Sequence, residues 1–220
     1  MIENLNKYID HTLLKPEAGD KEFTQLIEEA INYRFASVCV NGCFVADAVK
    51  KLFGTGVNVT AVVGFPLGAI SPAAKIAETN DVLVNGANEV DTVINIGALK
   101  DGSYNFVLAE LKAQAELCHQ YNAYLKVIIE TCLLTEEEIT KACELVMESG
   151  ADFIKTSTGF STGGATIEDV KLMKSIIGKS VKLKASGGIR TLDDAIKFIE
   201  AGADRLGCSA SVAIMEEYLK

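Results

Sequence analysis

The hexapeptide GADFIK at residues 150–155 belongs to a pattern that occurs three times in the chain. The related hexapeptides are GANEVD at 86–91 and GADRLG at 202–207. In each copy, a glycine stands where an amphipathic segment is expected to end, and a β-rich run follows at once. The recurrence therefore predicts a helix-to-strand junction that the fold uses repeatedly.

Short β-rich runs alternate with amphipathic segments along the whole chain. In 21–33, for example, the apolar residues follow the i, i+3, i+4, i+7 spacing of a helix that buries one face. Eight such strands with helices between them favour an α/β fold, a single-domain (β/α)8 TIM barrel over residues 1–220 with a short N-terminal extension. An open doubly wound sheet is the alternative, but the chain has no GxGxxG motif. The candidate strands are 8–14, 35–40, 57–65, 88–97, 124–131, 152–158, 181–186 and 204–209.

Capping residues mark several of the expected helix starts. Thr135 with Glu138 fits a capping box, and Thr166 and Thr191 each precede an aspartate by three residues. Ser71 is followed by a proline, which suits the first position of a helix. We therefore expect helices to begin directly after these residues.

The composition indicates a soluble globular protein and argues against nucleic acid as a partner. The chain has 220 residues, of which 49% are apolar and 23% are charged, and its formal net charge is −9. An acidic protein without a basic stripe does not suit a nucleic-acid backbone. The polar N-terminus and the interrupted apolar run at 59–70 predict no membrane segment. We therefore expect a cytoplasmic protein.

Cysteine and histidine usage predicts neither disulfides nor a metal site. The six cysteines form no CxxC pair, and most have apolar neighbours, which is typical of reduced cysteines in a cytosolic core. The two histidines, His11 and His119, have no ligand spacing between them. We expect no metal and no other cofactor.

Alternation along the strands assigns charged side chains to the barrel interior. In 88–97 the more apolar set belongs against the helices, so that Asp91 points inward. The hexapeptides place Asp91, Lys155 and Gly207 at the same height on alternate strands, and we expect them to share one interior layer. The same alternation also assigns Asp10, Lys126, Glu130, Lys182 and Lys184 to the interior.

The expected interior holds more lysines than carboxylates near its mouth. Charges buried in this way must be paired. Two carboxylates, Asp10 and Asp91, among the three lysines Lys126, Lys155 and Lys184 leave one positive charge in excess. The excess positive charge disappears most simply if one of the three lysines is neutral.

Lys155 is unusual because a lysine in a buried strand needs either a partner or a lowered pKa. Neighbouring strands lie roughly 4.8 Å apart, which places Lys184 close to Lys155. Burial and a nearby ammonium both lower a lysine pKa, and a neutral lysine attacks carbonyls to form a Schiff base. Asp91, or a water that it holds, is a candidate for proton transfer. The alternative interpretation is a structural salt-bridge network.

Lys182 lies on the same strand face as Lys184, so spacing alone leaves it open as the residue that lowers the pKa of Lys155. We favour Lys184, because it is nearer the carboxyl end of the strand, where the active sites of barrel enzymes form.

Glycine-rich stretches after the last strands predict an anion site. SGGIR (186–190) and LGCSAS (206–211) follow the seventh and eighth strands, where barrels often bind phosphate with backbone N–H groups. A simple tight turn would explain the two glycines equally well. STGG (161–164) suits either an active-site loop or a plain mobile loop. The candidate phosphate ligands are Gly159, Gly187, Gly188, Gly207 and Ser209.

These residues lie in stretches that closely resemble the 2-deoxy-D-ribose-5-phosphate aldolase family of class I aldolases. The resemblance covers essentially the whole chain, and the stretches together are far more specific than any one of them. The matching stretches are YIDHTLLKP (8–16), NEVDTVINIG (88–97), LKVIIET (125–131), FIKTSTGF (153–160), VKLKASGGIR (181–190) and LGCSAS (206–211).

The resemblance implies reversible, metal-free cleavage of 2-deoxyribose 5-phosphate to glyceraldehyde 3-phosphate and acetaldehyde, in the catabolism of deoxyribose phosphates. It implies that Lys155 forms the Schiff base, that Lys184 perturbs it and relays protons, and that Asp91 donates and accepts protons. Asp10 and Lys126 match supporting polar positions of the family. The partner is then a small phosphorylated sugar.

Other functions fit parts of the same pattern. A different lysine aldolase such as a transaldolase, a sugar-phosphate binder without catalysis, and a flavin-binding barrel are the alternatives. Some members of the resembled family carry a lysine directly after TSTG, where this chain has Phe160. The family often forms homodimers, so a homo-oligomer is expected as well.

Overall fold

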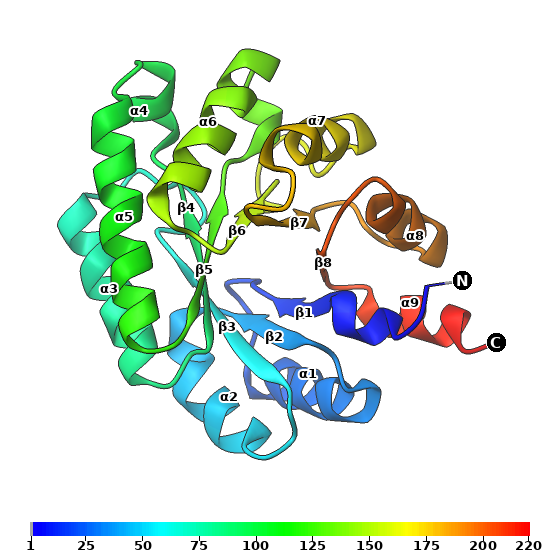
Figure 1. Cartoon of the computed structure of the whole chain (residues 1–220). Coiled ribbons are helices and arrows are strands. Elements are labelled where there is room, and N and C mark those ends of the chain that lie inside the picture. The colour runs from blue at the N-terminus through cyan, green and yellow to red at the C-terminus, as the bar shows by residue number, and fades with distance from the viewer. Residues whose placement is uncertain (1) are drawn as a thin grey trace.

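Eight parallel strands close into one barrel in the order of the chain. The computed structural model describes residues 2–220, and Figure 1 shows the helices surrounding the strands. This confirms the predicted (β/α)8 barrel and excludes the open doubly wound sheet. The strands are β1 (Ile9–Leu13), β2 (Ser37–Val40), β3 (Asn58–Val63), β4 (Glu89–Val93), β5 (Tyr124–Ile128), β6 (Phe153–Lys155), β7 (Lys182–Ser186) and β8 (Arg205–Cys208).

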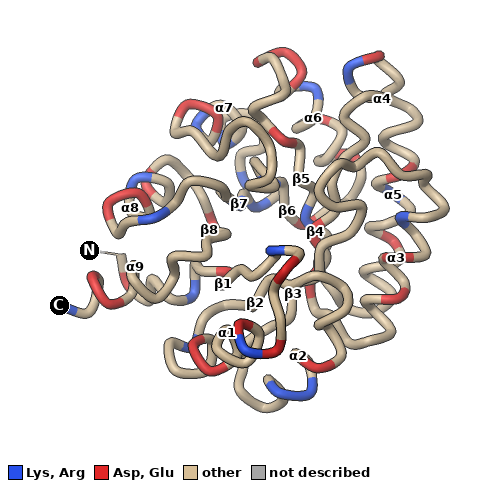
Figure 2. The backbone as a smooth tube through the Cα atoms, turned by 180° about the vertical axis from the view of Figure 1, so that it is seen from behind, with Lys and Arg blue, Asp and Glu red and all other residues tan. Residues whose placement is uncertain are grey.

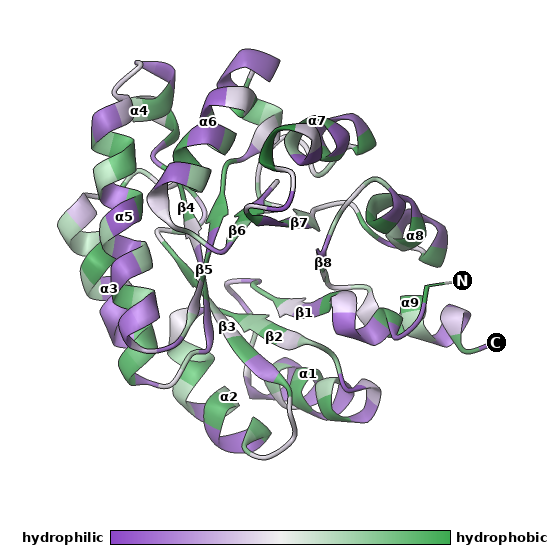
Figure 3. Ribbon diagram, in the orientation of Figure 1, coloured by the Kyte–Doolittle hydropathy of each residue, from purple (hydrophilic) through white to green (hydrophobic). Residues whose placement is uncertain are grey.

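The helices follow the strands and cover their outer faces. Figure 3 shows that the helices carry both hydrophobic and hydrophilic residues, as expected of elements that pack on one side only. The helices are α1 (Asp20–Tyr33), α2 (Val45–Leu52), α3 (Pro72–Val84), α4 (Ile96–Lys100), α5 (Tyr104–Gln120), α6 (Glu136–Ser149), α7 (Ile167–Ile177), α8 (Leu192–Glu200) and α9 (Ser211–Tyr218), with 3-10 turns η1 (Leu5–Tyr8), η2 (Gly42–Phe44) and η3 (Thr131–Leu133).

The predicted junctions and caps are confirmed. Gly86, Gly150 and Gly202 all have positive φ angles, of 95°, 82° and 118°, after α3, α6 and α8. Thr135 and Thr191 form capping boxes at the starts of α6 and α8. The predicted caps at Ser71 and Thr166 likewise accept hydrogen bonds from the first turns of α3 and α7.

Several of the predicted strands are too long at their carboxyl ends, most of all 88–97, 124–131 and 152–158, which end at Val93, Ile128 and Lys155. The pairing of β4 with β5 stops at Val93 and Ile128. Beyond it, Asn95 caps the additional helix α4, with its side chain accepting from the Ala98 N–H. Glu130 has a left-handed backbone with a φ of 56° and begins η3. The expectation that Glu130 faces the barrel interior is therefore wrong, because the chain has already turned away from the strand.

The short N-terminal extension is also present. The turn η1 precedes β1, and its Leu5 is fully buried. The Tyr218 hydroxyl of α9 donates a hydrogen bond of 2.7 Å to the carbonyl of Ile2. The two ends of the described chain thus lie side by side, as Figure 1 shows.

The strand register builds the barrel interior in layers. Asp91 pairs with Lys126, and Lys126 pairs with Phe153, which lies two residues before Lys155. The same advance of two residues for every two strands continues around the circle, as in other (β/α)8 barrels. The layers are Cys39, Asp91, Lys155 and Gly207 at the carboxyl end, then Asp10, Thr60, Lys126 and Lys184, then Ser37, Glu89, Phe153 and Arg205.

The shared layer of Asp91, Lys155 and Gly207 is therefore confirmed. The apolar core lies instead between the strands and the helices, where outward residues such as Val90, Ile154 and Leu183 are fully buried. Most side chains of the three interior layers are polar or charged, with Phe153 and Cys39 as buried hydrophobic members.

The cysteines are free thiols, and four of the six are buried. Burial raises the pKa of Cys118 and of Cys143 to about 12. Cys43 is exposed and Cys132 is half-buried, so these two lie outside the predicted core. Across residues 2–220, no helix is both long enough and apolar enough to cross a membrane.

We predict that Phe35→Ala lowers the free energy of unfolding by about 3–5 kcal/mol, because it leaves a cavity in the core. Phe35 is fully buried, and its ring lies 5.0 Å from that of His11 and 5.6 Å from that of Tyr33. Phe53 is 89% exposed, so Phe53→Ala serves as the matched control with a change of about 0.5 kcal/mol or less. Urea unfolding measures both; equal effects would contradict this assignment of the core.

Candidate active site

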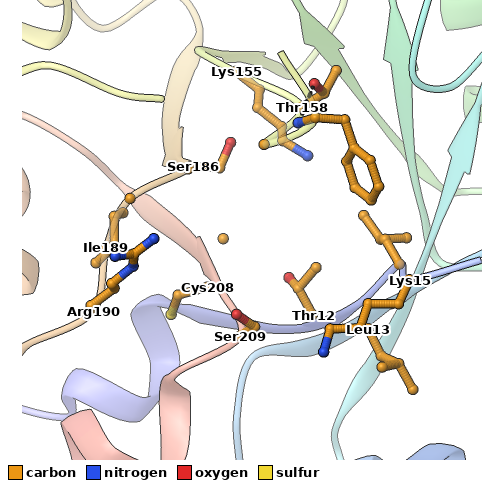
Figure 4. Close-up of a pocket in the computed structure, with 16 residues that line it drawn as sticks. Thr12, Leu13, Lys15, Lys155, Thr158, Ser186, Ile189, Arg190, Cys208 and Ser209 are labelled. Carbon is orange, nitrogen blue, oxygen red and sulfur yellow. Dashed lines mark hydrogen bonds between the residues drawn. The ribbon is translucent and has the colours of Figure 1, made fainter. Parts of the chain in front are cut away.

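A cavity of 280 Å³ opens at the carboxyl ends of the strands. Its lining comes from the carboxyl ends of β1, β6, β7 and β8 and from the segments that follow these strands, as Figure 4 shows. Lys155 is the lysine of the interior layers that reaches this lining. The predicted phosphate ligands Gly159, Gly187, Gly188, Gly207 and Ser209 all line it too.

Lys155 and Lys184 share one oxygen of Asp91. The Lys155 Nζ lies 2.8 Å from Asp91 Oδ2, and the Lys184 Nζ lies 2.7 Å from the same atom. All three side chains are buried, Lys155 with an exposure of 3%. The two amines therefore point to the same side of the barrel wall and meet at one carboxylate, as the sequence predicts.

The rest of the cluster lies below this contact, away from the pocket. Lys126 binds Asp91 Oδ1 at 2.9 Å and Glu89 Oε2 at 2.5 Å. Lys184 also binds Asp10 Oδ2 at 2.6 Å. Figure 2 shows charged segments on the strands inside the ring of helices. The predicted residues Asp10 and Lys126 are thus part of the same network, although neither lines the cavity.

The predicted ion count left out two members of the network, Arg205 and Glu89, although alternation places Glu89 on the same inward face as Asp91. The guanidinium of Arg205 contacts Asp10 and lies 3.2 Å from Glu89 Oε2. Three carboxylates therefore face four cations, so the predicted count of ions is wrong, although the excess of one positive charge is unchanged. The sequence could have predicted both residues. Glu89, Phe153 and Arg205 occupy the fourth position of the recurring hexapeptide, and the structure places them in one layer.

The excess positive charge is least neutralised at Lys155. Among the described residues, its Nζ has one carboxylate partner, whereas Lys184 has Asp10 and Asp91. Burial lowers the pKa of Lys155, and the Lys184 ammonium lowers it further, against the opposing effect of Asp91. Burial also acts to lower the pKa of Lys184, but Asp10 and Asp91 raise it above its usual value. Lys155 is therefore the amine that loses its proton more easily.

Asp91 remains ionised at this junction. Burial alone would raise the pKa of its carboxyl, but Lys126, Lys155 and Lys184 hold the pKa well below its usual range. Asp91 is thus an ionised hydrogen-bond acceptor for both Lys155 and Lys184.

Lys182 lies apart from the network. Its side chain is exposed, and its Nζ lies 5.4 Å from the centre of the Phe153 ring and 5.9 Å from that of Tyr124. Both distances fit cation–π contacts of the Lys182 ammonium with these rings. The choice of Lys184 over Lys182 as the neighbour of Lys155 is confirmed.

Buried polar contacts fix the loops around the cavity. Glu130 accepts hydrogen bonds from the N–H and the hydroxyl of Thr158, and that hydroxyl in turn accepts from the Phe160 N–H at 3.0 Å. The Phe160 ring stands edge-on to Phe65, with 5.3 Å between the ring centres. Glu130 therefore holds the loop after β6 instead of facing the barrel interior.

The STGG segment at 161–164 supports the glycine turn after β7. A Cβ atom on Gly164 would lie 2.3 Å from the carbonyl oxygen of Gly187, so only a glycine fits there. The Ala165 N–H donates to the carbonyls of Ser186 and Gly187 at 3.0 and 3.1 Å. The end of this segment is therefore packed against the cavity wall, whereas Ser161 and Thr162 are exposed.

Further lining residues were not singled out in the sequence. They include the hydroxyl-bearing Thr12 and Ser186 and the cations Lys15 and Arg190. Arg190 ends the motif SGGIR and Lys15 lies within YIDHTLLKP, but spacing does not show that two loops from opposite ends of the chain share one cavity. That proximity follows from the closure of β1 on β8.

We predict that Asp10→Asn destabilises the fold at pH 7 by about 3–5 kcal/mol, because it leaves buried cations short of a partner. Burial acts to raise the pKa of Asp10, but Arg205, Lys184 and Lys126 hold it far below the usual value near 3.8. The stabilising contribution is therefore complete above that value and is lost as the pH falls below it.

Urea unfolding at pH 5 and pH 3 measures this effect. The difference in unfolding free energy between the parent and Asp10→Asn should shrink by about 1 kcal/mol at pH 3. A difference that stays constant over this range would contradict the lowered pKa.

Comparisons with known proteins agree with this geometry. A family model described as DeoC/LacD family aldolase matches residues 5–216. A relative from Streptococcus equi subsp. zooepidemicus named deoxyribose-phosphate aldolase is 56% identical over 213 residues, 97% of this chain and 96% of the relative. One of the same name from Bacillus cytotoxicus is 55% identical over 212 residues, 96% of this chain and 95% of the relative.

Solved structures give the same result. A putative deoxyribose-phosphate aldolase from Coccidioides immitis superposes with a TM-score of 0.96 at 42% identity, covering 99% of this chain and 86% of that one. The deoxyribose phosphate aldolase from Aeropyrum pernix, described as a unique tetrameric structure, gives 0.91 at 32% identity, covering 98% and 91%. The resemblance inferred from the sequence motifs is confirmed, and the chain belongs to the DeoC/LacD family of aldolases.

Proposed function

We propose that this chain reversibly cleaves 2-deoxy-D-ribose 5-phosphate to D-glyceraldehyde 3-phosphate and acetaldehyde, with residues 1–220 acting as a single catalytic domain. One observation carries the proposal: Lys155 is buried at the floor of an open cavity and shares a single carboxylate oxygen with a second ammonium. The names of the relatives supply the substrate.

The amine of Lys155 starts the reaction. In its neutral form it attacks the C1 aldehyde of the open-chain sugar, and loss of water gives an iminium ion. The C3 hydroxyl then gives up its proton to Asp91, or to a water that Asp91 holds, the C2–C3 bond breaks, and its electrons pass to the iminium nitrogen as an enamine. Glyceraldehyde 3-phosphate leaves. Protonation of the enamine at C2 and addition of water release acetaldehyde and restore the amine.

The neighbours of Lys155 supply the protons. Lys184 is held as an ammonium by the two carboxylates that face it, so it has a proton to donate to the leaving hydroxide. Once Asp91 has returned the proton of the C3 hydroxyl to it, Lys184 donates again, to the enamine. Asp91 contacts both amines and passes protons between them. Asp10 and Lys126 support this relay from below, by holding Lys184 and Asp91 in place.

The glycine-rich rim binds the other end of the substrate. Gly159, Gly187, Gly188, Gly207 and Ser209 all line the cavity, and backbone N–H groups of this kind suit a phosphate. Figure 4 shows Lys155 and Arg190 separated across the cavity, which suits a substrate with an aldehyde at one end and a phosphate at the other.

The wider setting of the proposal follows from the same name. We propose a role in the catabolism of deoxyribose phosphates, in the cytoplasm, and a homo-oligomeric assembly. Support for the assembly comes from the Aeropyrum pernix relative, which is described as tetrameric.

We predict that Lys155→Leu abolishes cleavage of 2-deoxyribose 5-phosphate while the barrel stays folded, because leucine removes the nucleophile and leaves an apolar side chain of similar size. Treatment of the parent with acetaldehyde and borohydride should leave a covalent mass increment on Lys155, located by peptide mass spectrometry. The matched control is Lys182→Leu, which removes an exposed lysine outside the network and should keep both activity and labelling.

Several outcomes would contradict the proposal. Labelling at another lysine, or none, would remove Lys155 from its role. Stabilisation by the sugar phosphate without turnover would favour a binding protein, and turnover only with three-carbon ketone donors would favour a transaldolase. A yellow purified protein would favour a flavin-binding barrel.

A further inference from the structure

We propose that Lys15 is a second cation for the phosphate of the substrate, placed opposite Arg190 at the mouth of the cavity. The inference rests on the proposed function, because it assigns a side chain to the anionic end of that substrate. It adds a charged group to a site otherwise built from glycine N–H groups and Arg190.

The charges of the cavity favour a dianion. Its 16 lining residues include Lys15, Lys155 and Arg190, and they include no aspartate or glutamate. This contrasts with a chain whose net charge is −9. Lys155 is held by Asp91, so two cations remain at the rim. A phosphate monoester near neutral pH carries about −1.5 to −2 charges, which two cations match.

The barrel topology brings Lys15 to the phosphate end. β1 pairs with β8, and β8 pairs with β7. Lys15 lies two residues after the end of β1, the Gly187–Gly188 turn follows β7, and Gly207 and Ser209 lie at the end of β8 and just after it. Three consecutive strands therefore supply the lysine, the Gly-Gly turn with Arg190, and the Gly207–Ser209 segment. Figure 4 shows Lys15 and Arg190 on opposite sides of the cavity.

The backbone of Lys15 is anchored, whereas its ammonium is available. The Lys15 carbonyl accepts a hydrogen bond of 3.2 Å from the Ala18 N–H, and the Asn41 side chain donates to the Leu14 carbonyl at 3.3 Å. The Lys15 side chain is exposed, and within residues 2–220 it forms no ion pair. The carboxylate of Glu22 accepts instead from the Gly19 N–H, at 3.2 Å.

The loop after β6 contributes no charge that would make Lys15 redundant. Phe160 occupies the lining beside Gly159 and packs edge-on against Phe65. Among the lining residues, the cation that faces Arg190 is therefore Lys15, from the segment after β1.

The test compares three variants on two substrates. Lys15→Met removes the charge, Lys15→Arg keeps it, and Lys21→Met removes an exposed lysine of α1 that does not line the cavity. We expect kcat/KM for 2-deoxyribose 5-phosphate to fall about tenfold in Lys15→Met, the loss of one charge-assisted contact. Lys15→Arg should restore most of it, and Lys21→Met should leave it unchanged. With unphosphorylated 2-deoxyribose, all variants should match the parent.

Two results would overturn the inference. In one, Lys15→Met keeps the preference of the parent for the phosphorylated sugar. In the other, it loses activity equally on both sugars, which would place the effect away from the phosphate.

A measurement without turnover separates this inference from the proposed function. Calorimetric titration with inorganic phosphate should show affinity about tenfold weaker for Lys15→Met than for the parent. Equal affinities would reject Lys15 even in an active aldolase. A parent that binds phosphate through Lys15 but cleaves neither sugar would reject the proposed function and leave the phosphate contact standing.

Discussion

A single carboxylate oxygen of Asp91 holds two buried ammonium groups, and the polar interior of the barrel is arranged around that contact. Lys155 and Lys184 lie 2.8 and 2.7 Å from it. Because one carboxylate cannot neutralise both, Asp10 is required beneath Lys184, and further ions follow below. Lys155, in the layer nearest the cavity, has the fewest carboxylate partners among the cations of the network, so the excess positive charge is least neutralised there. The site thus gains an amine that releases its proton easily.

This arrangement is costly for the fold. Replacing buried ion pairs with apolar side chains is often neutral or stabilising, so the interior network does not explain why the barrel is stable. Stability comes from the apolar shell between strands and helices, in which residues such as Val90 and Leu183 are fully buried. The apolar shell and the ion network thus have different roles. The shell holds the strands in register, and the register brings charges from distant parts of the chain to one point.

Much of the barrel interior could be predicted from the sequence, because a repeated hexapeptide and the alternation of apolar and polar residues can be recognised within short segments. The recurring hexapeptide predicts the layer of Asp91, Lys155 and Gly207, and alternation predicts which face each strand turns inward. The ends of strands were predicted less well, since Asn95 and Glu130 leave the ladder through backbone turns that apolar pattern does not mark. The ion count and the rim cations required barrel closure, which joins residues nearly 200 positions apart, as in the contact of Arg205 with Asp10.

The central claim is that Lys155 carries the lowered pKa while Lys184 keeps its proton. NMR titration of the lysine ε-groups in the isotope-labelled protein tests it directly, with the Lys155 signal assigned by its absence from Lys155→Leu. The account predicts that Lys155 titrates below the ordinary lysine value near 10.5 and that Lys184 titrates above it. A Lys155 signal that titrates at or above the ordinary value would contradict the account.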